Sequence, residues 1–193
     1  MVYRGFRVYL VLSVILWMIA FGASAPVPVQ ASGQAALSAE DPHQINFIVR
    51  QSERAFDALQ KKDTAAVQRI IQEFSNRKIN PGDLFRIGMH FYRGGEDAAR
   101  NLRFARKPRV ASKLFFISAM GGNVEAQLML ASLFFKGKVL EKNLVQAYVW
   151  STIAQRNPGL NPEMASYPDR IIHRAEQSMT PAQLTQARRL LKK

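Results

Sequence analysis

Few side chains in this chain of 193 residues could carry out acid–base, nucleophilic or metal chemistry. Its three histidines, His43, His90 and His173, are scattered, and no His-x-x-x-His pair places two of them on one helical face. The absence of cysteine excludes disulfides, thiolate metal ligands and cysteine nucleophiles. The sequence also lacks a glycine-rich phosphate loop after a strand and a Gly-x-Ser-x-Gly turn. We therefore predict that the protein is not an enzyme and that it has no metal site and no cofactor.

The formal net charge of +13 favours anionic partners, and most of the excess lies in two segments. No acidic residue occurs between Asp97 and Glu125, and this stretch contains a run of cations that we call the basic patch. The basic patch comprises Arg100, Arg103, Arg106, Lys107, Arg109 and Lys113. If residues 96–106 form a helix, four of these cations share one face, and we predict a docking surface for a partner protein with an acidic surface. The alternative is a solvated loop, because charge runs commonly cover exposed faces.

The second basic segment ends the chain and consists of Arg188, Arg189, Lys192 and Lys193. Cations in the last turn of a helix interact favourably with the helix dipole, so this cluster requires no binding role.

The N-terminal residues have the plan of a signal peptide. Arg4 and Arg7 precede a 14-residue apolar run over residues 8–21, which is shorter than the ~20 residues of a membrane-spanning helix. Cleavage after Ala31 would leave Ser32 as the new terminus, whereas cleavage after Ala25 would leave a proline. We therefore predict a signal peptide over residues 1–31, a flexible linker over 32–40, and a periplasmic or secreted bacterial protein. The alternative is an uncleaved N-terminal anchor.

From residue 41 to residue 193, the apolar residues follow helical spacing and helix start signals recur. Asp41-Pro42 and Asp63 are expected to begin the first two helices, and Asn80-Pro81-Gly82 breaks the chain after them. Later, Asn157-Pro158-Gly159 ends a helix, and the sequence Thr180-Pro-Ala-Gln183 predicts a capping box at the start of the last one. We therefore predict an all-α fold.

Two segments of the helical region repeat each other. Residues 83–94 align with residues 126–137, so that Gly88 corresponds to Ala131 and Gly94 to Gly137. A second pattern of small, aromatic and small residues follows each segment, at positions 112, 115 and 119 and again at 147, 150 and 154. On this alignment the two helices of the first repeat are separated by eight more residues than those of the second. The two sets of the second pattern are 35 residues apart, and a period in this range indicates stacked helical hairpins.

The repeated pattern resembles the Sel-one-like repeat (SLR), a relative of the tetratricopeptide repeat. The second copy matches it better, with Ala126, Leu130, Ala131, Phe134, Gly137, Ala147, Trp150 and Ala154. The first copy departs from it, since Asp83 and Ser112 replace the two alanines. The resemblance implies a right-handed α/α solenoid of helical hairpins over residues 41–193. Its clearest repeats would be residues 83–122 and 123–157, followed by capping helices over 162–193.

Proteins of this family are scaffolds that bind other proteins. The resemblance therefore implies an exported, non-enzymatic module for protein–protein interaction in the cell envelope, which scaffolds or regulates its partner. We expect the first helix of each pair to line the concave side, with candidate contacts Arg86, His90, Arg93, Gln127 and Lys136. Export and the lack of a base-reading motif argue against nucleic acid. The alternative is a peripheral envelope protein that the basic segments attach to a membrane surface of anionic lipid or to polysaccharide. Salt should abolish that attachment more readily than an interface with an apolar centre.

Overall fold

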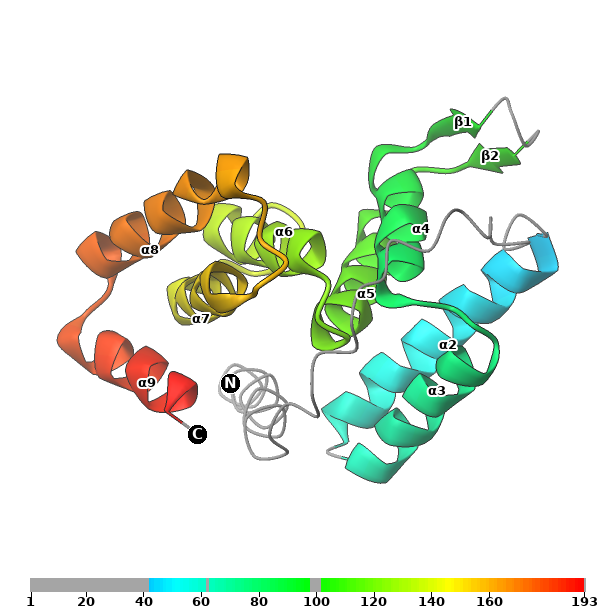
Figure 1. The fold of residues 1–193 in the computed structure, drawn as a ribbon, viewed down its shortest axis with the longest axis horizontal. Helices are drawn as coiled ribbons and strands as arrows, with labels where there is room; N and C mark the ends of the chain where they lie inside the picture. Colours follow the sequence, from blue (N-terminus) through cyan, green and yellow to red (C-terminus); the bar gives the residue numbers. More distant parts are fainter. Residues whose placement is uncertain (1–41, 62, 98–101, 193) are drawn as a thin grey trace, which may run out of the picture.

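The computed structural model describes residues 42–61, 63–97 and 102–192, and this part of the chain is all-helical apart from one short β-hairpin (Figure 1). The first helices are α2 (Pro42–Gln60), α3 (Thr64–Asn76) and α4 (Pro81–Arg93), and the hairpin consists of β1 (Gly95–Asp97) and β2 (Leu102–Phe104). The chain continues through α5 (Pro108–Met120), α6 (Val124–Lys136), α7 (Leu144–Arg156), the 3₁₀ turn η1 (Pro162–Met164), α8 (Ser166–Ser178) and α9 (Pro181–Leu191). The predicted all-α class is confirmed.

The signal peptide predicted over residues 1–31 and the linker predicted over residues 32–40 lie outside the described residues. Within residues 42–61, 63–97 and 102–192, no helix combines the length and the apolar composition needed to cross a lipid bilayer.

Local capping determines where most of the helices begin. Asp63 accepts a hydrogen bond from the backbone N–H of Ala66 at 2.9 Å, as predicted for the start of α3. The predicted capping box of α9 is also confirmed, because the side chains of Thr180 and Gln183 each accept a hydrogen bond from the other residue's backbone N–H. These bonds satisfy N–H groups that have no partner within the helix.

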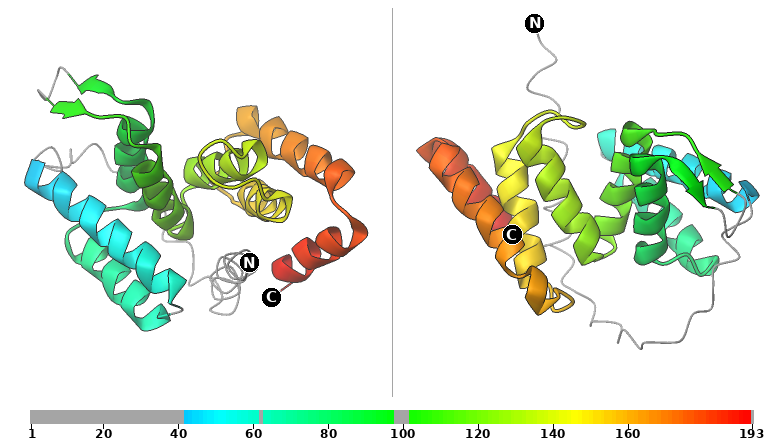
Figure 2. Two further views of the ribbon diagram at one scale, coloured as in Figure 1. Left: turned by 180° about the vertical axis from the view of Figure 1, so that it is seen from behind. Right: turned by 90° about the horizontal axis from the view of Figure 1, so that it is seen from above.

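The helices follow one another along a curve (Figure 1). The closest packing joins α4 to α5 and α6 to α7, while α5 also packs on α6, and α7 on α8. Seen from the front and from behind, α5, α7 and α9 lie on the inner side of the curve and α4, α6 and α8 on the outer side (Figures 1 and 2). This differs from our expectation that the first helix of each pair lines the concave side.

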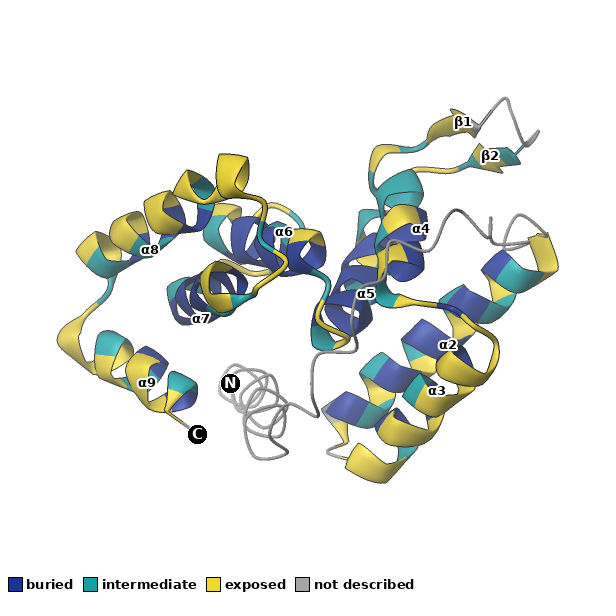
Figure 3. Ribbon diagram, in the orientation of Figure 1, coloured by how far each residue is buried: buried dark blue, intermediate teal, exposed yellow. Residues whose placement is uncertain are grey.

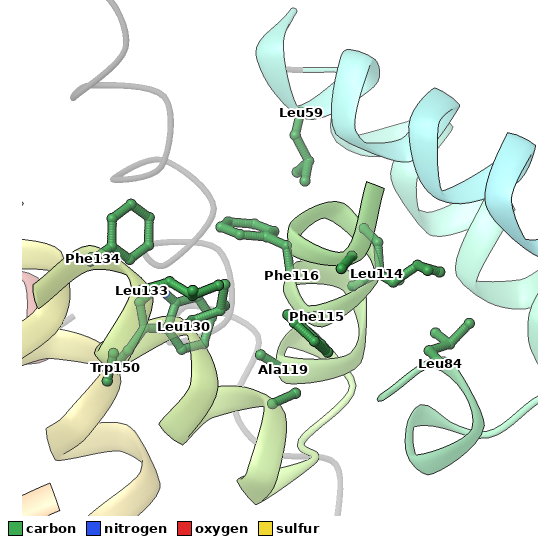
Figure 4. Packing of buried hydrophobic residues seen from close by; sticks show 14 of the residues in the cluster. Leu59, Leu84, Leu114, Phe115, Phe116, Ala119, Leu130, Leu133, Phe134 and Trp150 are labelled. Carbon is green, nitrogen blue, oxygen red and sulfur yellow. The ribbon is translucent and has the colours of Figure 1, made fainter. Parts of the chain in front are cut away.

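Aromatic side chains of α5 and α7 form the centre of the core (Figure 4). Phe115 is fully buried and packs on α4, with its ring centroid 5.5 Å from that of Phe85. The neighbouring Phe116 packs edge-on against Phe56 of α2 at 6.0 Å and against Trp150 of α7 at 5.7 Å. Figure 3 shows the result: α5 and α7 are buried along most of their length, whereas α3, α8 and α9 expose a long face.

The pairs α4–α5 and α6–α7 close their loops with the same contacts. The backbone N–H of Lys107 donates to the carbonyl of Phe91 at 2.7 Å, and that of Asn143 donates to Phe134 at 3.0 Å. In both pairs the residue that precedes the N-cap of the second helix lies against the glycine that ends the first. A Cβ atom added at Gly94 would lie 3.0 Å from the Cβ of Arg106, and one added at Gly137 would lie 2.7 Å from that of Lys142.

These contacts set the register of the repeat. The first helices are displaced by 43 residues, as Pro81 and Val124 show, and the second helices by 36 residues, as Pro108 and Leu144 show. The difference between these displacements makes the insertion in the first loop seven residues long, not eight. The predicted displacement of 35 residues between the two second helices is therefore wrong by one residue. The buried residues that correspond are therefore Ala111 with Ala147, Leu114 with Trp150 and Ser118 with Ala154. The first repeat keeps the alanine that we had expected Ser112 to replace.

The insertion contains a β-hairpin, so the helix over residues 96–106 that would have placed four cations on one face is not formed. Glu96 lies opposite Arg103 in the antiparallel ladder, and Gly95 lies opposite Phe104. Two successive glycines with positive φ, 72° at Gly94 and 114° at Gly95, turn the chain out of α4. Such angles favour glycine and are incompatible with continuing a helix. Alternation along β2 then places Leu102 and Phe104 on one face, partly buried against the core, and leaves Arg103 exposed.

Candidate functional site

The base of the hairpin is anchored on α4 by aromatic contacts. The ring of Phe104 stacks on that of His90, with centroids 4.6 Å apart and planes inclined by 17°, and it meets the ring of Phe91 edge-on at 5.4 Å. The backbone of Lys107 is held by its hydrogen bond to Phe91. The predicted contact residue His90 therefore has a packing role beneath the hairpin.

Four exposed cations surround this base, and we call them the basic neck: Arg93, Arg106, Lys107 and Arg109. Arg93 is the last residue of α4, and the backbone of Arg106 passes directly beside the following Gly94. Lys107 is the N-cap residue of α5 and makes no side-chain cap hydrogen bond, while Arg109 lies in the first turn of that helix. The structure thus brings the predicted contact Arg93 together with three residues of the basic patch.

The electrostatics of the basic neck are unfavourable for the helix that it precedes. The N-terminus of a helix carries a partial positive charge, which repels cations and favours acids. The first turn of α5 contains no acidic residue, whereas α4 has Asp83 and α6 has Glu125 at this position. Three cations of the neck, Arg106, Lys107 and Arg109, therefore lie where α5 gains no stability from them.

Two other residues of the basic patch are engaged in contacts with acids. Arg103 pairs with Glu96 across the hairpin at 2.7 Å. The Nζ atom of Lys113 lies 3.4 Å from Oε1 of Glu53 and 5.8 Å from the centre of the Phe56 ring, so this side chain joins α5 to α2. Lys113 is therefore part of a helix contact. Arg100 lies outside the described residues.

The remaining predicted contacts lie on the outer helices. Arg86 is exposed on α4 and pairs with Asp83 at 3.3 Å, and Lys136 is exposed at the end of α6. Gln127 is only 3% exposed, so the prediction that it contacts a partner is wrong. Its amide donates to the carbonyl of Ala119 at 3.2 Å and accepts from Asn157 at 3.2 Å, which ties α6 to both of its neighbours.

Asp83 is a largely buried carboxylate at the start of α4. Burial raises the pKa of its carboxyl above the ordinary value, although the hydrogen bond from the backbone of Asn80 and the nearby Arg86 guanidinium act in the opposite direction. In the second repeat the corresponding residue is Ala126, which is fully buried. The carboxylate serves the capping box with Asn80, so a structural role accounts for it.

Sequence reasoning missed a set of buried polar atoms on α7 and α2. In the described part of the chain, Gln146 of α7 has neither amide atom hydrogen-bonded, although it is 1% exposed. The indole N–H of Trp150 and the hydroxyl of Ser151 lack a partner as well, as do Gln51 Oε1 and Ser52 Oγ of α2. An unpaired buried polar group costs about 1–3 kcal/mol. The signal that could have found Gln146 is its counterpart in the first repeat, the apolar Val110, and that correspondence requires the register that the structure gives.

No group of three or more histidine, aspartate or glutamate side chains that could hold a metal ion occurs among the residues that the structure describes. The chain matches no family model, and no curated protein or solved structure is detectably similar to it. The Sel-one-like assignment therefore stays a prediction that rests on the sequence pattern.

Proposed function

We propose that this protein is an exported helical-repeat module without catalytic activity, and that it binds and scaffolds or regulates another protein in the cell envelope. The paired helices would form a right-handed α/α solenoid of the Sel-one-like type. The N-terminal segment would direct export to the periplasm, either as a cleaved signal peptide or as an anchor.

The observation that carries this proposal is the equivalence of α4–α5 and α6–α7. Both pairs close their loops with the same backbone hydrogen bond and the same approach of a chain to a glycine. A repeated helical hairpin builds an extended surface on which each unit presents side chains at equivalent positions, which is the arrangement used for binding other polypeptides.

The charge distribution supports an acidic partner. Cations lie at the loop end of both pairs, with Arg93 and Arg106 in the first and Lys136 and Lys142 at the corresponding positions of the second. A positive surface of this kind accelerates association with acidic proteins and selects against basic ones.

Recovery of partners from envelope extract tests the proposal. The full chain with a C-terminal affinity tag should retain a defined protein after a wash in about 300 mM salt, because an interface with an apolar centre withstands screening. Treatment with a reversible cross-linker before lysis would capture the same protein. Recovery of anionic lipid or polysaccharide alone, with loss of the material at high salt, would favour peripheral attachment and contradict the proposal.

Export has its own readout, which is fractionation of cells that produce the tagged chain. The proposal expects the chain in the envelope fraction, with an N-terminal sequence that begins at Ser32 if cleavage follows Ala31. A chain found wholly in the cytoplasm would contradict export.

A further inference from the structure

We propose that the basic neck, together with the adjacent β-hairpin, is the docking surface for an extended acidic segment of the partner protein. This inference rests on the proposed function, because it identifies where and how the partner would be held.

The fold gains little from the cations of the basic neck. Arg106, Lys107 and Arg109 surround the positive end of α5, and no ion pair joins them or Arg93 to any described residue. Like charges held close together repel one another and the helix dipole. By contrast, the nearby Lys113 is paired with Glu53 in a contact between two helices. The cations of the neck are therefore available to a partner, and an acidic ligand would relieve their repulsion.

The backbone also holds the basic neck in place. The hydrogen bond of 2.7 Å from Lys107 to Phe91 and the close approach of Arg106 to Gly94 fix the chain at the base of the insertion. The stacking of Phe104 on His90 fixes the hairpin above it. A preformed surface loses less conformational entropy on binding than a loose one.

The strands of the hairpin indicate the form of the ligand. Within the described residues the sheet contains only β1 and β2, so neither strand is paired with a further strand at its outer edge. In an antiparallel strand, alternate residues direct their backbone N–H and C=O groups outward, and an extended polypeptide can pair with them as an added strand. A two-stranded hairpin is only marginally stable alone, so a third strand would also strengthen it.

Charge complementarity and the open strand edge together favour a polypeptide. The exposed face of the hairpin carries the pair Arg103 and Glu96, while the four cations of the neck lie at its base. An acidic segment that pairs with the edge of β2 would place its carboxylates near Arg106, Lys107 and Arg109. A lipid surface would make no use of the backbone groups at that edge.

A labelled peptide of about ten residues that alternates glutamate and threonine is a suitable probe, with fluorescence anisotropy as the readout. We expect the full chain, purified in the form in which the cell leaves it, to bind this peptide at about 50 mM salt and more weakly at about 300 mM. A peptide that alternates glutamate and proline has the same charge but cannot donate backbone hydrogen bonds from its proline positions. It should bind several-fold more weakly.

Two triple variants with equal loss of charge provide the comparison. The neck variant R106S/K107S/R109S should bind the glutamate–threonine peptide at least about tenfold more weakly than wild type, a difference of about 1.4 kcal/mol. The control variant R174S/R189S/K192S removes three exposed cations from α8 and the C-terminal end, and its affinity should change by no more than about twofold. The urea midpoint of the neck variant should equal or slightly exceed that of wild type, which separates lost binding from lost folding. The charge-reversed variant R106E/K107E/R109E should instead bind a lysine–threonine peptide.

Three results would overturn the proposal. Equal losses in the neck and control variants would mean that net charge alone attracts the peptide. Neck-dependent binding of phosphatidylglycerol vesicles with no binding of the peptide would assign the surface to lipid. Recovery of the envelope partner in unchanged amount by the neck variant would remove the docking role from the neck and leave the proposed function standing, whereas failure of wild type to recover any partner would contradict the proposed function itself.

Discussion

The helix pairs α4–α5 and α6–α7 have the same closure but differ in the loop between their helices. In both, a backbone hydrogen bond links the start of the second helix to an aromatic residue near the end of the first. The loop of α6–α7 is short and ends at Asn143, whose side chain caps α7. The loop of α4–α5 is seven residues longer, forms a hairpin and ends at Lys107, which provides no side-chain cap. The two pairs therefore share the contacts that close the loop and differ in the length and charge of the loop itself.

The interior of the two pairs differs as well. Gly88 of α4 lets Phe115 pack directly against the helix backbone, whereas the corresponding position of α6 is Ala131. Leu114 occupies the buried position that Trp150 occupies in the second pair. The smaller side chains of the first pair are compensated by Phe115 and Phe116, so the two pairs reach similar burial by different residues.

The largest expected effect separates the two pairs at their central buried side chains. Trp150→Ala should lower the free energy of unfolding by about 3–5 kcal/mol, because it removes a fully buried ring that also contacts Phe116. Leu114→Ala should cost less, about 2–4 kcal/mol, since a smaller volume is lost. Urea denaturation followed by circular dichroism measures both. A smaller loss of unfolding free energy for Trp150→Ala than for Leu114→Ala would contradict the structural equivalence of the two positions.

Exchange of the small residues between the pairs should be asymmetric. A Cβ at position 88 would lie 2.7 Å from a ring carbon of Phe115, so Gly88→Ala should cost about 1–3 kcal/mol despite the better helix propensity of alanine. The reverse change, Ala131→Gly, should cost about 0.5–1 kcal/mol, mainly through backbone entropy. Thermal unfolding of the two variants compares them directly. A stabilised Gly88→Ala protein would show that the helices are not in close contact there.

Grafting the short loop onto the first pair tests the shared closure. In this variant residues 95–106 are replaced by the sequence Lys-Val-Leu-Glu-Lys of residues 138–142. The loss should stay below about 2 kcal/mol, because only the partly buried Leu102 and Phe104 leave the core and the shorter loop is easier to close. Helical content from circular dichroism should be unchanged. Loss of cooperative unfolding would mean that the hairpin is needed to hold α4 and α5 together.

Making the second pair resemble the first at a buried polar position should be stabilising. Gln146→Val copies Val110 and removes two buried amide atoms that have no hydrogen-bond partner in the described structure. We expect a gain of about 1 kcal/mol, since the desolvation penalty of the amide disappears while some packing volume is lost. The urea midpoints of Gln146→Val and wild type measure this difference in stability. A loss of more than about 1 kcal/mol would show that the amide makes a stabilising interaction.

The smallest effect concerns pH and the start of each pair. The pKa of Asp83 is raised from 3.8 by burial, so the folded state retains a proton that the unfolded state has already released. Stability therefore falls as pH rises from 3.8 through the folded-state pKa. Asp83→Asn does not titrate, and its stability relative to wild type should increase between about pH 4 and pH 7. Ala126→Gly, a change in the other pair, should show the same offset at both pH values.

Those features that depend on neighbours in the sequence could be predicted. Asp63 and the Thr180–Gln183 box mark helix starts through hydrogen bonds to residues three positions away, so the chain itself carries the information. The insertion could not be assigned, because its run of cations fits an amphipathic helix as well as a hairpin. The signal that decides it is the pair Gly94-Gly95, whose positive φ values end α4 and turn the chain.

The register of the second helices and the position of Gln127 required the structure. Residues on every face of α5 are buried. The predicted counterparts Ser112, Phe115 and Ala119 are therefore as small or apolar as the true counterparts, each of which lies one residue earlier in the chain. Periodicity alone cannot choose between these two registers. For Gln127, the aligned residue of the first repeat is Leu84, which is buried, and this correspondence was the available warning. Which helices lie inside the curve depends on contacts between distant segments, such as that between Phe56 and Phe116.

The position of Phe116 also determines how the molecule should open. Its ring contacts α2 on one side and α7 on the other, so neither neighbouring unit can unfold without exposing it. In hydrogen exchange, the amides of α5 and α7 should therefore belong to one slow, cooperative group. The amides of α3 and α9, at the two ends of the helical array, should exchange first by local opening. A ligand bound at the loop of α4–α5 would then slow the exchange of the amides of α7, a helix that the ligand does not touch.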